Sequence, residues 1–494
     1  MNSRQTLSPA TLLGFLAVFF CLYLPLCQWL GLASPRLFDL QGVSYPAGWG
    51  AGVAWAAVLL LFLAPLVWIA VSGTIDYLAL HLVLNGLVIY GYFFIDQTAT
   101  KIFGAEQAVL GGAAQALAVN AIGFFILMAV LVVCYTAFAL RGKPLPPLPA
   151  LPETLDRRLA AWLFPVMVVE IVLIALPMAL TRTIPMVSED PMVGRFVLEQ
   201  SNLGRPLYNL ASSLLPALAA GSLILALRRK GWLAKLCNRE AVLALTALAV
   251  QYLTSNRLPL AYTLLAFFAL LTLEYRFPRG LLPFGLVLFV AGYLGLSGLS
   301  SILRQNRELL GDGHLIRDSF SEAFLGDNLS DLRDGAWVLG NWDYVPLDGK
   351  TYLGALTSVA PSTLFPQKKE WYLGLVAIRI VNWPDDQHFG LRLSFFVESF
   401  LNFGLAGVAG LAVLLGAYFS YLLRFLHLAA RQDRQCLLRN LRLLLLIQLG
   451  LTFANSSEGF VSYSILALLL LMRLFIDVPA RPKAKAALPQ WSAA

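Results

Sequence analysis

Charged side chains are scarce in this chain, and their scarcity excludes an ordinary soluble domain. Charged residues make up 13% of the 494 positions, whereas apolar residues make up 59%. Soluble globular domains carry about 25% charged residues. Stretches of alternating apolar and polar residues, which are typical of outer-membrane barrels, are also missing. The composition therefore favours a helical protein that crosses a membrane several times.

Cysteine is also rare, and its placement excludes a disulfide framework for the main polar segment. The five cysteines lie in apolar runs or at the basic ends of such runs, and none lies between residues 303 and 392. We therefore expect packing alone to hold that segment. The cysteines and the four histidines show no spacing typical of metal ligands. The sequence thus predicts neither a metal nor a cofactor.

Long apolar runs dominate the chain and predict its fold class. A bilayer core about 30 Å thick requires about 20 apolar residues in a helix, and the sequence contains about twelve runs of that kind. We therefore predict an all-α polytopic membrane protein. The predicted spans are 11–33, 48–72, 76–95, 115–140, 158–181, 207–228, 240–255, 258–274, 280–302, 393–425, 440–455 and 459–476.

The runs divide the chain into four parts. Residues 1–302 hold the first nine spans and a short outer loop at 182–206. Residues 303–392 form a large polar loop or cap, 393–476 hold the last three spans, and 477–494 form a tail. The first run lacks a small-residue cleavage site, so we interpret it as a retained helix rather than a signal peptide.

The distribution of lysine and arginine predicts which side the large loop faces. Cytoplasmic loops of membrane proteins carry an excess of these residues. With a cytoplasmic N-terminus and the spans above, 21 of the 36 basic residues fall in inner segments, which makes every alternate loop basic. The 303–392 loop is therefore predicted to face outward, with both termini cytoplasmic. The net charge of +8 is then a topogenic signal, and no nucleic-acid partner is expected.

Arginines gather in two of the short outer segments. Arg195 and Arg205 lie in the 182–206 loop, and Arg257 lies in a tight turn between two short spans. A guanidinium grips phosphate through a planar set of donors and stays charged. These three residues are therefore predicted to bind a phosphate or pyrophosphate. The alternatives are contacts with lipid headgroups, ion pairs with nearby acids, and snorkelling to the interface.

The large outer loop combines charged residues with aromatic rings. Its Asn328–Leu339 stretch places acids ahead of an apolar pattern, which predicts a helix beginning at Ser330. Indole rings offer flat apolar platforms on which the C–H face of a sugar can rest. Trp337, Trp342 and Trp383 are therefore predicted to stack on sugar. The same rings can instead form the core of a small packed cap.

A few polar residues lie inside the predicted spans. Glu170 is the deepest, and a carboxylate at that depth would need a partner. Chains of such groups form proton relays in transporters, so a transport function is an alternative interpretation. The residues concerned are Asp76, His81, Asn85, Glu170 and Glu458.

Several short motifs together give the chain a family resemblance. They are the twelve-span layout, the loop from Arg195 to Arg205, the Asn256-Arg257 turn, the stretches Gly326 to Asp334 and Pro361 to Pro366, the Arg379 to Gly390 spacing, and Glu398 to Gly407 with its Asn402-Phe-Gly404 run. On these motifs the chain resembles the Wzy-type oligosaccharide repeat-unit polymerases, which make O-antigen and exopolysaccharide in bacterial inner membranes. The third outer loop departs from the family pattern, because eleven residues rather than ten separate Arg182 from Gly194.

The resemblance implies a GT-C-like architecture and glycosyl transfer at the periplasmic face. The donor would be a growing glycan on undecaprenyl pyrophosphate, and the acceptor a lipid-linked repeat unit. The lipid pyrophosphate is the leaving group, so the reaction needs no nucleotide sugar and no metal, and the sequence has no Asp-x-Asp metal motif. The implied partners are the bilayer and, in the same pathway, a chain-length regulator and a flippase.

The resemblance also implies roles for the outer polar residues. Arginines would neutralise the charge that develops on the leaving pyrophosphate, and a base within hydrogen-bond reach would take the proton of the acceptor hydroxyl. The pyrophosphate-binding candidates are Arg195, Arg205, Arg257, Arg333, Arg379 and Arg392, and the base candidates are Asp331, His388 and Glu398.

Three other functions fit parts of the pattern. An O-antigen ligase shares the fold and the arginines and is marked by a histidine in its large loop, so His314 and His388 keep this function open. A lipid-linked oligosaccharide flippase or another transporter places its charges in a central cavity. A non-enzymatic scaffold accounts for the spans but not for the clustered outer arginines.

Overall fold

Every regular element that the computed structural model describes is a helix. It describes residues 95–99, 104–140, 153–188, 191–200, 204–228, 238–254, 258–274, 331–357, 363–383, 391–432 and 437–454, with a few single positions between 292 and 317. Within these ranges there is no strand. This confirms the all-α class that the apolar runs predict.

The long helices of the described part coincide with predicted apolar runs. Three of them are long and apolar enough to cross a membrane, over Glu106–Ala137, Ala161–Thr181 and Phe395–Arg424. Their length and composition indicate a membrane protein. The long helices are α5 (Glu106–Leu140), α6 (Glu153–Thr181), α8 (Gly204–Leu227), α10 (Arg239–Leu253), α11 (Leu258–Glu274), α17 (Phe395–Gln432) and α18 (Leu437–Ala454).

The remaining predicted spans lie wholly or almost wholly outside the described residues, as does the 477–494 tail. The total number of spans therefore stays a prediction. The spans concerned are 11–33, 48–72, 76–95, 280–302 and 459–476.

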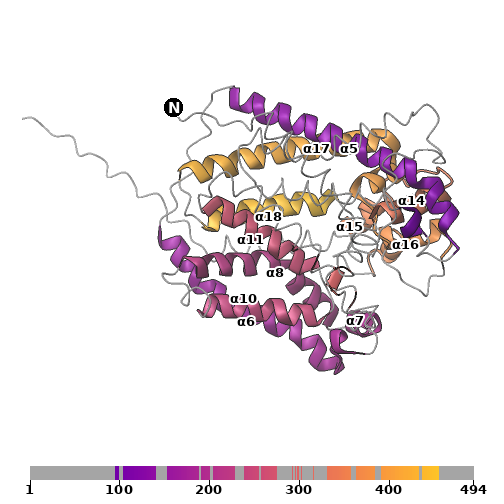
Figure 1. Ribbon diagram of the computed structural model, residues 1–494. Helices are drawn as coiled ribbons and strands as arrows, with labels where there is room; N and C mark the ends of the chain where they lie inside the picture. Colours follow the sequence, from indigo (N-terminus) through magenta and orange to yellow (C-terminus); the bar gives the residue numbers. More distant parts are fainter. Residues whose placement is uncertain are drawn as a thin grey trace, which may run out of the picture.

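The long helices run side by side, and the short helices gather at one end of the bundle (Figure 1). Helix α7 comes from the 182–206 loop, whereas α14, α15 and α16 come from the 303–392 loop. The two segments predicted to share an outer face thus lie at the same end of the molecule. The short helices are α7 (Pro191–Gln200), α14 (Asp331–Asn341), α15 (Lys350–Leu356) and α16 (Leu373–Ile380).

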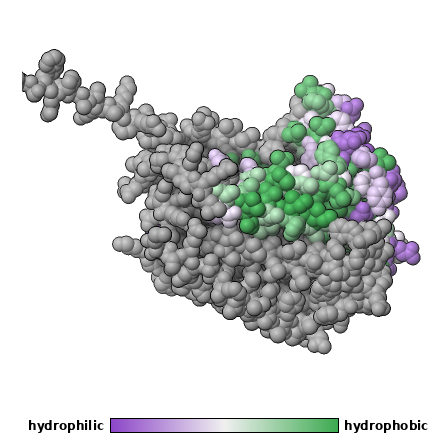
Figure 2. Space-filling view, turned by 90° about the horizontal axis from the view of Figure 1, so that it is seen from above, coloured by the Kyte–Doolittle hydropathy of each residue, from purple (hydrophilic) through white to green (hydrophobic). Residues whose placement is uncertain are grey.

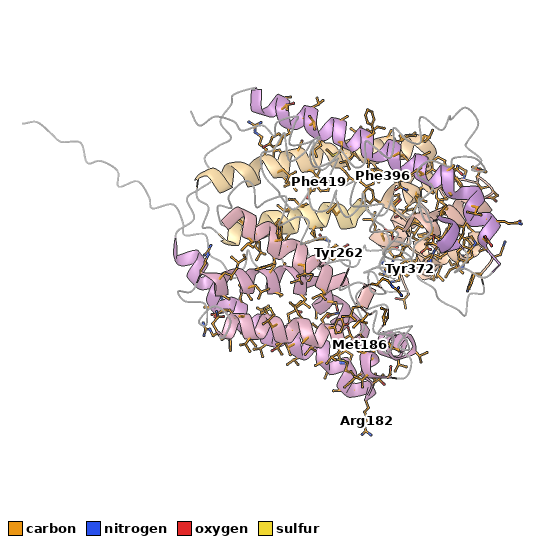
Figure 3. The ribbon with its side chains drawn as sticks, viewed as in Figure 1. Arg182, Met186, Tyr262, Tyr372, Phe396 and Phe419 are labelled. Carbon is orange, nitrogen blue, oxygen red and sulfur yellow. The ribbon has the colours of Figure 1, made fainter. Side chains whose placement is uncertain are left out.

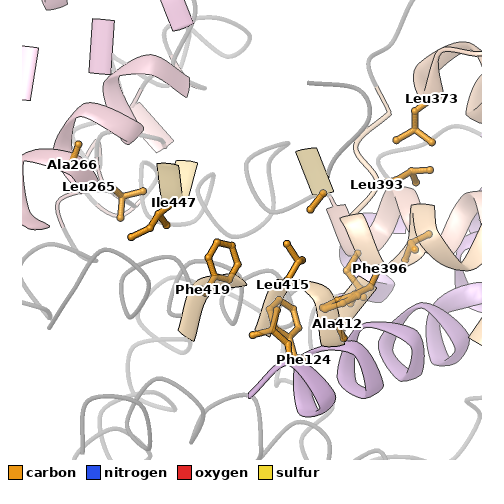
Figure 4. Packing of buried hydrophobic residues seen from close by; sticks show 14 of the residues in the cluster. Phe124, Leu265, Ala266, Leu373, Leu393, Phe396, Ala412, Leu415, Phe419 and Ile447 are labelled. Carbon is orange, nitrogen blue, oxygen red and sulfur yellow. The ribbon is translucent and has the colours of Figure 1, made fainter. Parts of the chain in front are cut away.

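Helices α5 and α17 pack along each other and form one half of the core (Figure 4). Phe124 of α5 meets the ring of Phe396 edge to face, with ring centroids 5.1 Å apart. Gly123 leaves room for that ring, because a Cβ at this position would overlap it. Gly416 lies in the same way against the backbone of Leu127. Small residues thus allow the close helix contact that membrane proteins favour.

The other half of the core surrounds α8, which packs against α6, α10 and α11. Fully buried alanines line these contacts, including Ala219 and Ala220 of α8 and Ala244 and Ala247 of α10. Helix α18 joins the two halves, because it packs against both α17 and α11. The membrane part of the described structure is therefore one continuous core.

Helix α14 is held against the N-terminal end of α5 by a close backbone crossing. Gly112 of α5 lies against the carbonyl of Ala336, and Gly340 of α14 lies against the carbonyl of Ala108. A Cβ at either glycine would overlap the facing carbonyl, so only glycine permits this approach. The crossing fixes the direction of α14 and, with it, the position of the polar residues in its first turn.

The face of the molecule that α5 covers presents apolar side chains next to the hydrophilic end that carries the short helices (Figure 2). Phe125 is 55% exposed and Val133 is 63% exposed on α5. On α6, Val169 and Val172 are each 54% exposed. Apolar helix faces that lie open in this way suit contact with lipid.

Candidate functional site

The first turn of α14 carries a group of three charged residues at this end of the molecule. The helix begins at Asp331, directly after the predicted start at Ser330, with Asp331 and Asp334 in the first turn. Arg333 is 9% exposed and Asp334 is 3% exposed. The Nε and Nη2 atoms of Arg333 each lie 2.9 Å from Oδ1 of Asp334. The two charges are thus buried as a hydrogen-bonded pair.

Asp334 also fixes the chain where it enters α17. Its Oδ2 atom accepts the backbone N–H of Arg392 at 3.1 Å. The Arg392 side chain is exposed. The carboxylate of Asp334 therefore holds Arg333 with one oxygen and the backbone of Arg392 with the other, and it brings two of the predicted pyrophosphate-binding residues together.

Asp331 lies within the electrostatic reach of both arginines. Burial raises the pKa of its carboxyl above the ordinary value of 3.8, and the charge of Asp334 adds to this effect. The charges of Arg392 and Arg333 lower the pKa of the same group, but burial remains the largest cause. A carboxyl with a raised pKa beside guanidinium groups can accept a proton more readily near neutral pH.

A second polar group joins α15 to the outer end of α17. The hydroxyl of Thr351 donates to Oε1 of Glu398 at 2.8 Å, and Nδ2 of Asn402 donates to the Thr351 oxygen, also at 2.8 Å. Nδ2 of Asn402 also donates to the carbonyl of Glu398 at 2.9 Å. Glu398 and Asn402 have no exposed surface, and Thr351 is 1% exposed. The network lies in the interior, where Glu398 orients α15, and its role as a base stays a prediction.

Tyr352 of α15 lies next to this network. Burial raises the pKa of its hydroxyl, the charge of Glu398 raises it further, and Ser399 partly offsets both effects. The hydroxyl therefore stays neutral. Its ring stacks on Phe403, with ring centroids 6.1 Å apart and the planes 10° from parallel. Tyr352 thus closes the apolar side of the α15–α17 contact.

Helix α17 is broken at Gly404, directly after the polar network. Gly404 has φ 63° and ψ −156°, a conformation that only glycine adopts readily. One turn before the break, the carbonyl of Leu401 accepts the backbone N–H of Leu347 at 3.0 Å. The Asn402-Phe-Gly404 run is therefore the point at which the cap segment is pinned to the membrane helix.

Two of the three tryptophans predicted to stack on sugar are core residues in the structure. Trp337 is 6% exposed and packs edge to face on Trp383, with ring centroids 5.1 Å apart. Trp342 is 8% exposed, its Nε1 donates to the carbonyl of Val345, and its ring packs against Phe400. Trp383 is half-buried. These contacts favour the packed-cap alternative for Trp337 and Trp342, whose rings belong to the core of the cap.

The other predicted site residues are placed less completely. Arg379 lies in the last turn of α16, where it is exposed. Arg195 lies in α7 and Arg205 in the first turn of α8, and only their backbones are described. His388 and Arg257 lie outside the described residues. Arg182, by contrast, ends α6 with a positive φ and extends away from the bundle (Figure 3), far from Tyr372 of the cap.

The two residues that organise these groups are not among the predicted site residues. For Asp334, its place directly after Arg333 is a sequence signal for a local ion pair. Thr351 carries no such signal, because it meets Glu398 only through the tertiary fold. No group of three or more histidine, cysteine or acidic side chains suitable for a metal occurs among the described residues.

Comparisons with known proteins give no family for this chain. No protein-family model matches it, and neither a curated protein nor a solved structure matches it. Its function therefore has to be argued from the geometry and chemistry of the residues themselves.

Proposed function

We propose that the chain is a metal-independent glycosyltransferase that polymerises undecaprenyl-pyrophosphate-linked oligosaccharide repeat units into O-antigen or exopolysaccharide. The observation that carries this proposal is the cluster of Asp331, Arg333 and Arg392 at one end of an apolar helix bundle. The cluster combines a carboxyl of raised pKa with guanidinium groups beside a surface suited to lipid. This is the combination that a lipid-pyrophosphate donor requires.

The proposed reaction assigns a separate task to each charge. The Asp331 carboxylate takes the proton of the acceptor hydroxyl, whose oxygen forms a bond to the anomeric carbon of the donor. The bond between that carbon and the pyrophosphate oxygen breaks, and the lipid pyrophosphate leaves with the electron pair. The exposed guanidinium of Arg392, with Arg379, neutralises the negative charge that develops. Buried Arg333 holds Asp334 in place, and its positive charge acts on Asp331.

The remaining features of the proposal concern architecture and location. We propose twelve membrane spans in a GT-C-like arrangement, a bacterial inner-membrane location, and a periplasmic cap formed by residues 303–392. Support comes from the positions of α7 and the cap helices at the same end of the bundle. The basic residues of the sequence concentrate near the other ends of the long helices, as in Arg228-Arg229-Lys230 after α8.

Glycan analysis of a strain that lacks the chain tests this function against its alternatives. A polymerase deletion should leave a single repeat unit attached to its final acceptor. Free lipid-linked polymer would instead indicate a ligase, and cytoplasmic accumulation of unpolymerised units would indicate a flippase. Unchanged glycan would contradict all three functions and favour a scaffold.

Single substitutions test the assignment of the arginines. Arg392→Ala, Arg379→Ala and Arg257→Ala should abolish chain extension while expression of the protein persists. Lys350→Ala is the matched control, because Lys350 is an exposed cation of the cap with no role in the proposed site. Wild-type chain lengths in all three arginine variants would remove the pyrophosphate assignment. If the Lys350 variant loses chain extension to the same degree, the effect would come from the loss of any positive charge in the cap and not from a specific arginine site.

A further inference from the structure

Glu170 lies near the middle of the apolar span of α6. The apolar span of this helix runs from Ala161 to Thr181, and Glu170 is 3% exposed. At about 1.5 Å of rise per residue, its backbone is about 14 Å from one end of the span and about 16 Å from the other. The carboxyl therefore sits near the midplane of a bilayer core about 30 Å thick.

Glu170 belongs to the face of α6 that packs into the protein. Leu163, Met167 and Ile174 are buried at helical spacing on either side of it. Val169 and Val172 lie on the opposite face and are exposed. The carboxyl consequently points toward the neighbouring helices and away from the lipid-facing surface.

Among the described helices packed against α6, none supplies a charge at this depth. These helices are α7, α8, α10 and α18. The charged residues of α8, α10 and α18 lie near helix ends, as does the pair of Arg239 with Glu240 at the start of α10. The other charged residues of these helices are Arg195 and Glu199 of α7, Arg205 of α8 with Arg228 just after it, and Arg439 and Arg442 of α18.

One oxygen of the carboxyl also lacks a hydrogen bond. The Oε2 atom of Glu170 is buried and has no hydrogen-bond partner. The sequence predicts that a carboxylate at this depth needs a partner, and the described residues supply none for this oxygen. An ionised carboxylate without a partner is very costly in an apolar interior, whereas the neutral acid is far less so.

We propose that Glu170 is a proton-binding site within the membrane domain, and that its carboxyl carries a proton in the packed arrangement of α6, α8 and α10. Glycosyl transfer at the cap makes no use of this proton, so the site is a property of the chain beyond its proposed function. A metal cation is a poorer occupant, because hard cations take several oxygen ligands and the described helices packed against α6 place no second acidic side chain at this depth.

The prolines of α6 give this site a route for exchange. Pro165 and Pro177 lie inside the helix on either side of Glu170. Each removes one backbone hydrogen bond and weakens the helix locally. Bending at these points would admit water to the carboxyl and let the proton leave.

Infrared difference spectroscopy tests the proposal without any dependence on reagent access. Both the wild-type protein and the Glu170→Gln variant are reconstituted in lipid at neutral pH. The spectrum of the wild type minus that of the variant should show the carbonyl stretch of a protonated carboxyl. That band lies at higher frequency than the carbonyl stretch of a glutamine amide, and it should shift to lower frequency in D2O. A carboxylate band in place of the carbonyl band would overturn the proposal. A carbonyl band that disappears when sodium ions are added would show that the site binds a cation instead.

A hydrophobic carbodiimide provides an independent chemical test. Dicyclohexylcarbodiimide adds to a protonated carboxyl and rearranges to a stable N-acylurea that retains all atoms of both reactants. Peptide mass analysis should find one added carbodiimide on Glu170 and none in the Glu170→Gln variant. Labelling of the cap by a water-soluble carbodiimide with Glu170 untouched would agree with a membrane-buried acid. Labelling of Glu170 by the water-soluble reagent would place the group in water and refute the proposal.

Discussion

The carboxylate of Asp334 holds the backbone N–H of Arg392 at 3.1 Å, and this one contact ties the cap helix α14 to the start of the membrane helix α17. The same carboxylate pairs with Arg333 through its other oxygen. Both charges of the pair are buried. The arrangement therefore couples the position of the proposed catalytic cluster to the rigid core, because α14 and α17 both pack on α5.

Asp334→Asn should destabilise the protein by about 3 kcal/mol, because it removes the carboxylate that pairs with buried Arg333. It should also stop chain extension through misplacement of Arg392. Thermal unfolding in detergent gives the first quantity, and glycan chain length gives the second. Glu370→Gln, which alters an exposed acid of the cap, serves as the reference and should leave both unchanged. A stable Asp334 variant would show that the ion pair contributes nothing.

Asp331→Asn should abolish chain extension and yet stabilise the protein at neutral pH. Burial raises the pKa of Asp331, so the folded state holds its proton more tightly than the unfolded state does. The contribution of this group to stability is therefore greatest at acidic pH and declines as the pH rises above the ordinary value of 3.8 toward the raised value. Unfolding temperatures measured across this pH range should diverge in favour of the variant. A variant that is less stable than wild type at neutral pH would contradict the prediction.

Thr351→Val should cost about 2 kcal/mol of stability, because buried Glu398 loses a hydrogen bond to a charged group. Thr351→Ser keeps the hydroxyl and should lose much less. Thr357→Val removes a half-buried hydroxyl at the C-cap of α15, which donates to backbone carbonyls, and it controls for the substitution itself. Denaturation of the three variants in detergent ranks them. If valine at positions 351 and 357 lowers stability equally, the Thr351 hydrogen bond to Glu398 contributes no specific stabilisation.

Gly404→Ala should destabilise the break in α17 by about 1–3 kcal/mol through backbone strain alone. Its φ of 63° disfavours any side chain, while the space around an added Cβ is empty. Gly410→Ala lies in the same helix with equally empty space and no positive φ, so it should be neutral or slightly stabilising. Thermal unfolding separates the two effects. The prediction fails if both alanines behave alike.

Gly112→Ala should loosen the cap, whereas Gly111→Ala should not. A Cβ at position 112 would overlap the carbonyl of Ala336, and a Cβ at position 111 would meet no atom within 4 Å. Overpacking of this kind costs about 1–3 kcal/mol. Limited proteolysis should cleave the 331–383 region faster in the first variant than in the second. Identical cleavage rates would exclude the close crossing of α5 and α14.

Some of these features were predictable from local sequence. The long apolar runs predict the helices because a bilayer core demands them, and the acids before Trp337 predict where α14 begins. The burial of Trp337 and Trp342 was not predictable, because an indole ring suits a packed core as well as a sugar surface. The burial of Glu398 was not predictable from local sequence either. Its partner Thr351 is 47 residues away and meets it only in the folded protein.

The sequence by itself determined the helical class and the concentration of charge outside the apolar runs, because both depend on composition and on spacing along the chain. Only the tertiary structure decided which charges meet. Asp331, Arg333 and Arg392 come together because α14 crosses α5 at two glycines and because Asp334 binds the chain before α17. It also placed Glu170 inside the core with its Oε2 atom unpaired among the described residues, since burial there depends on which face of α6 the neighbouring helices cover.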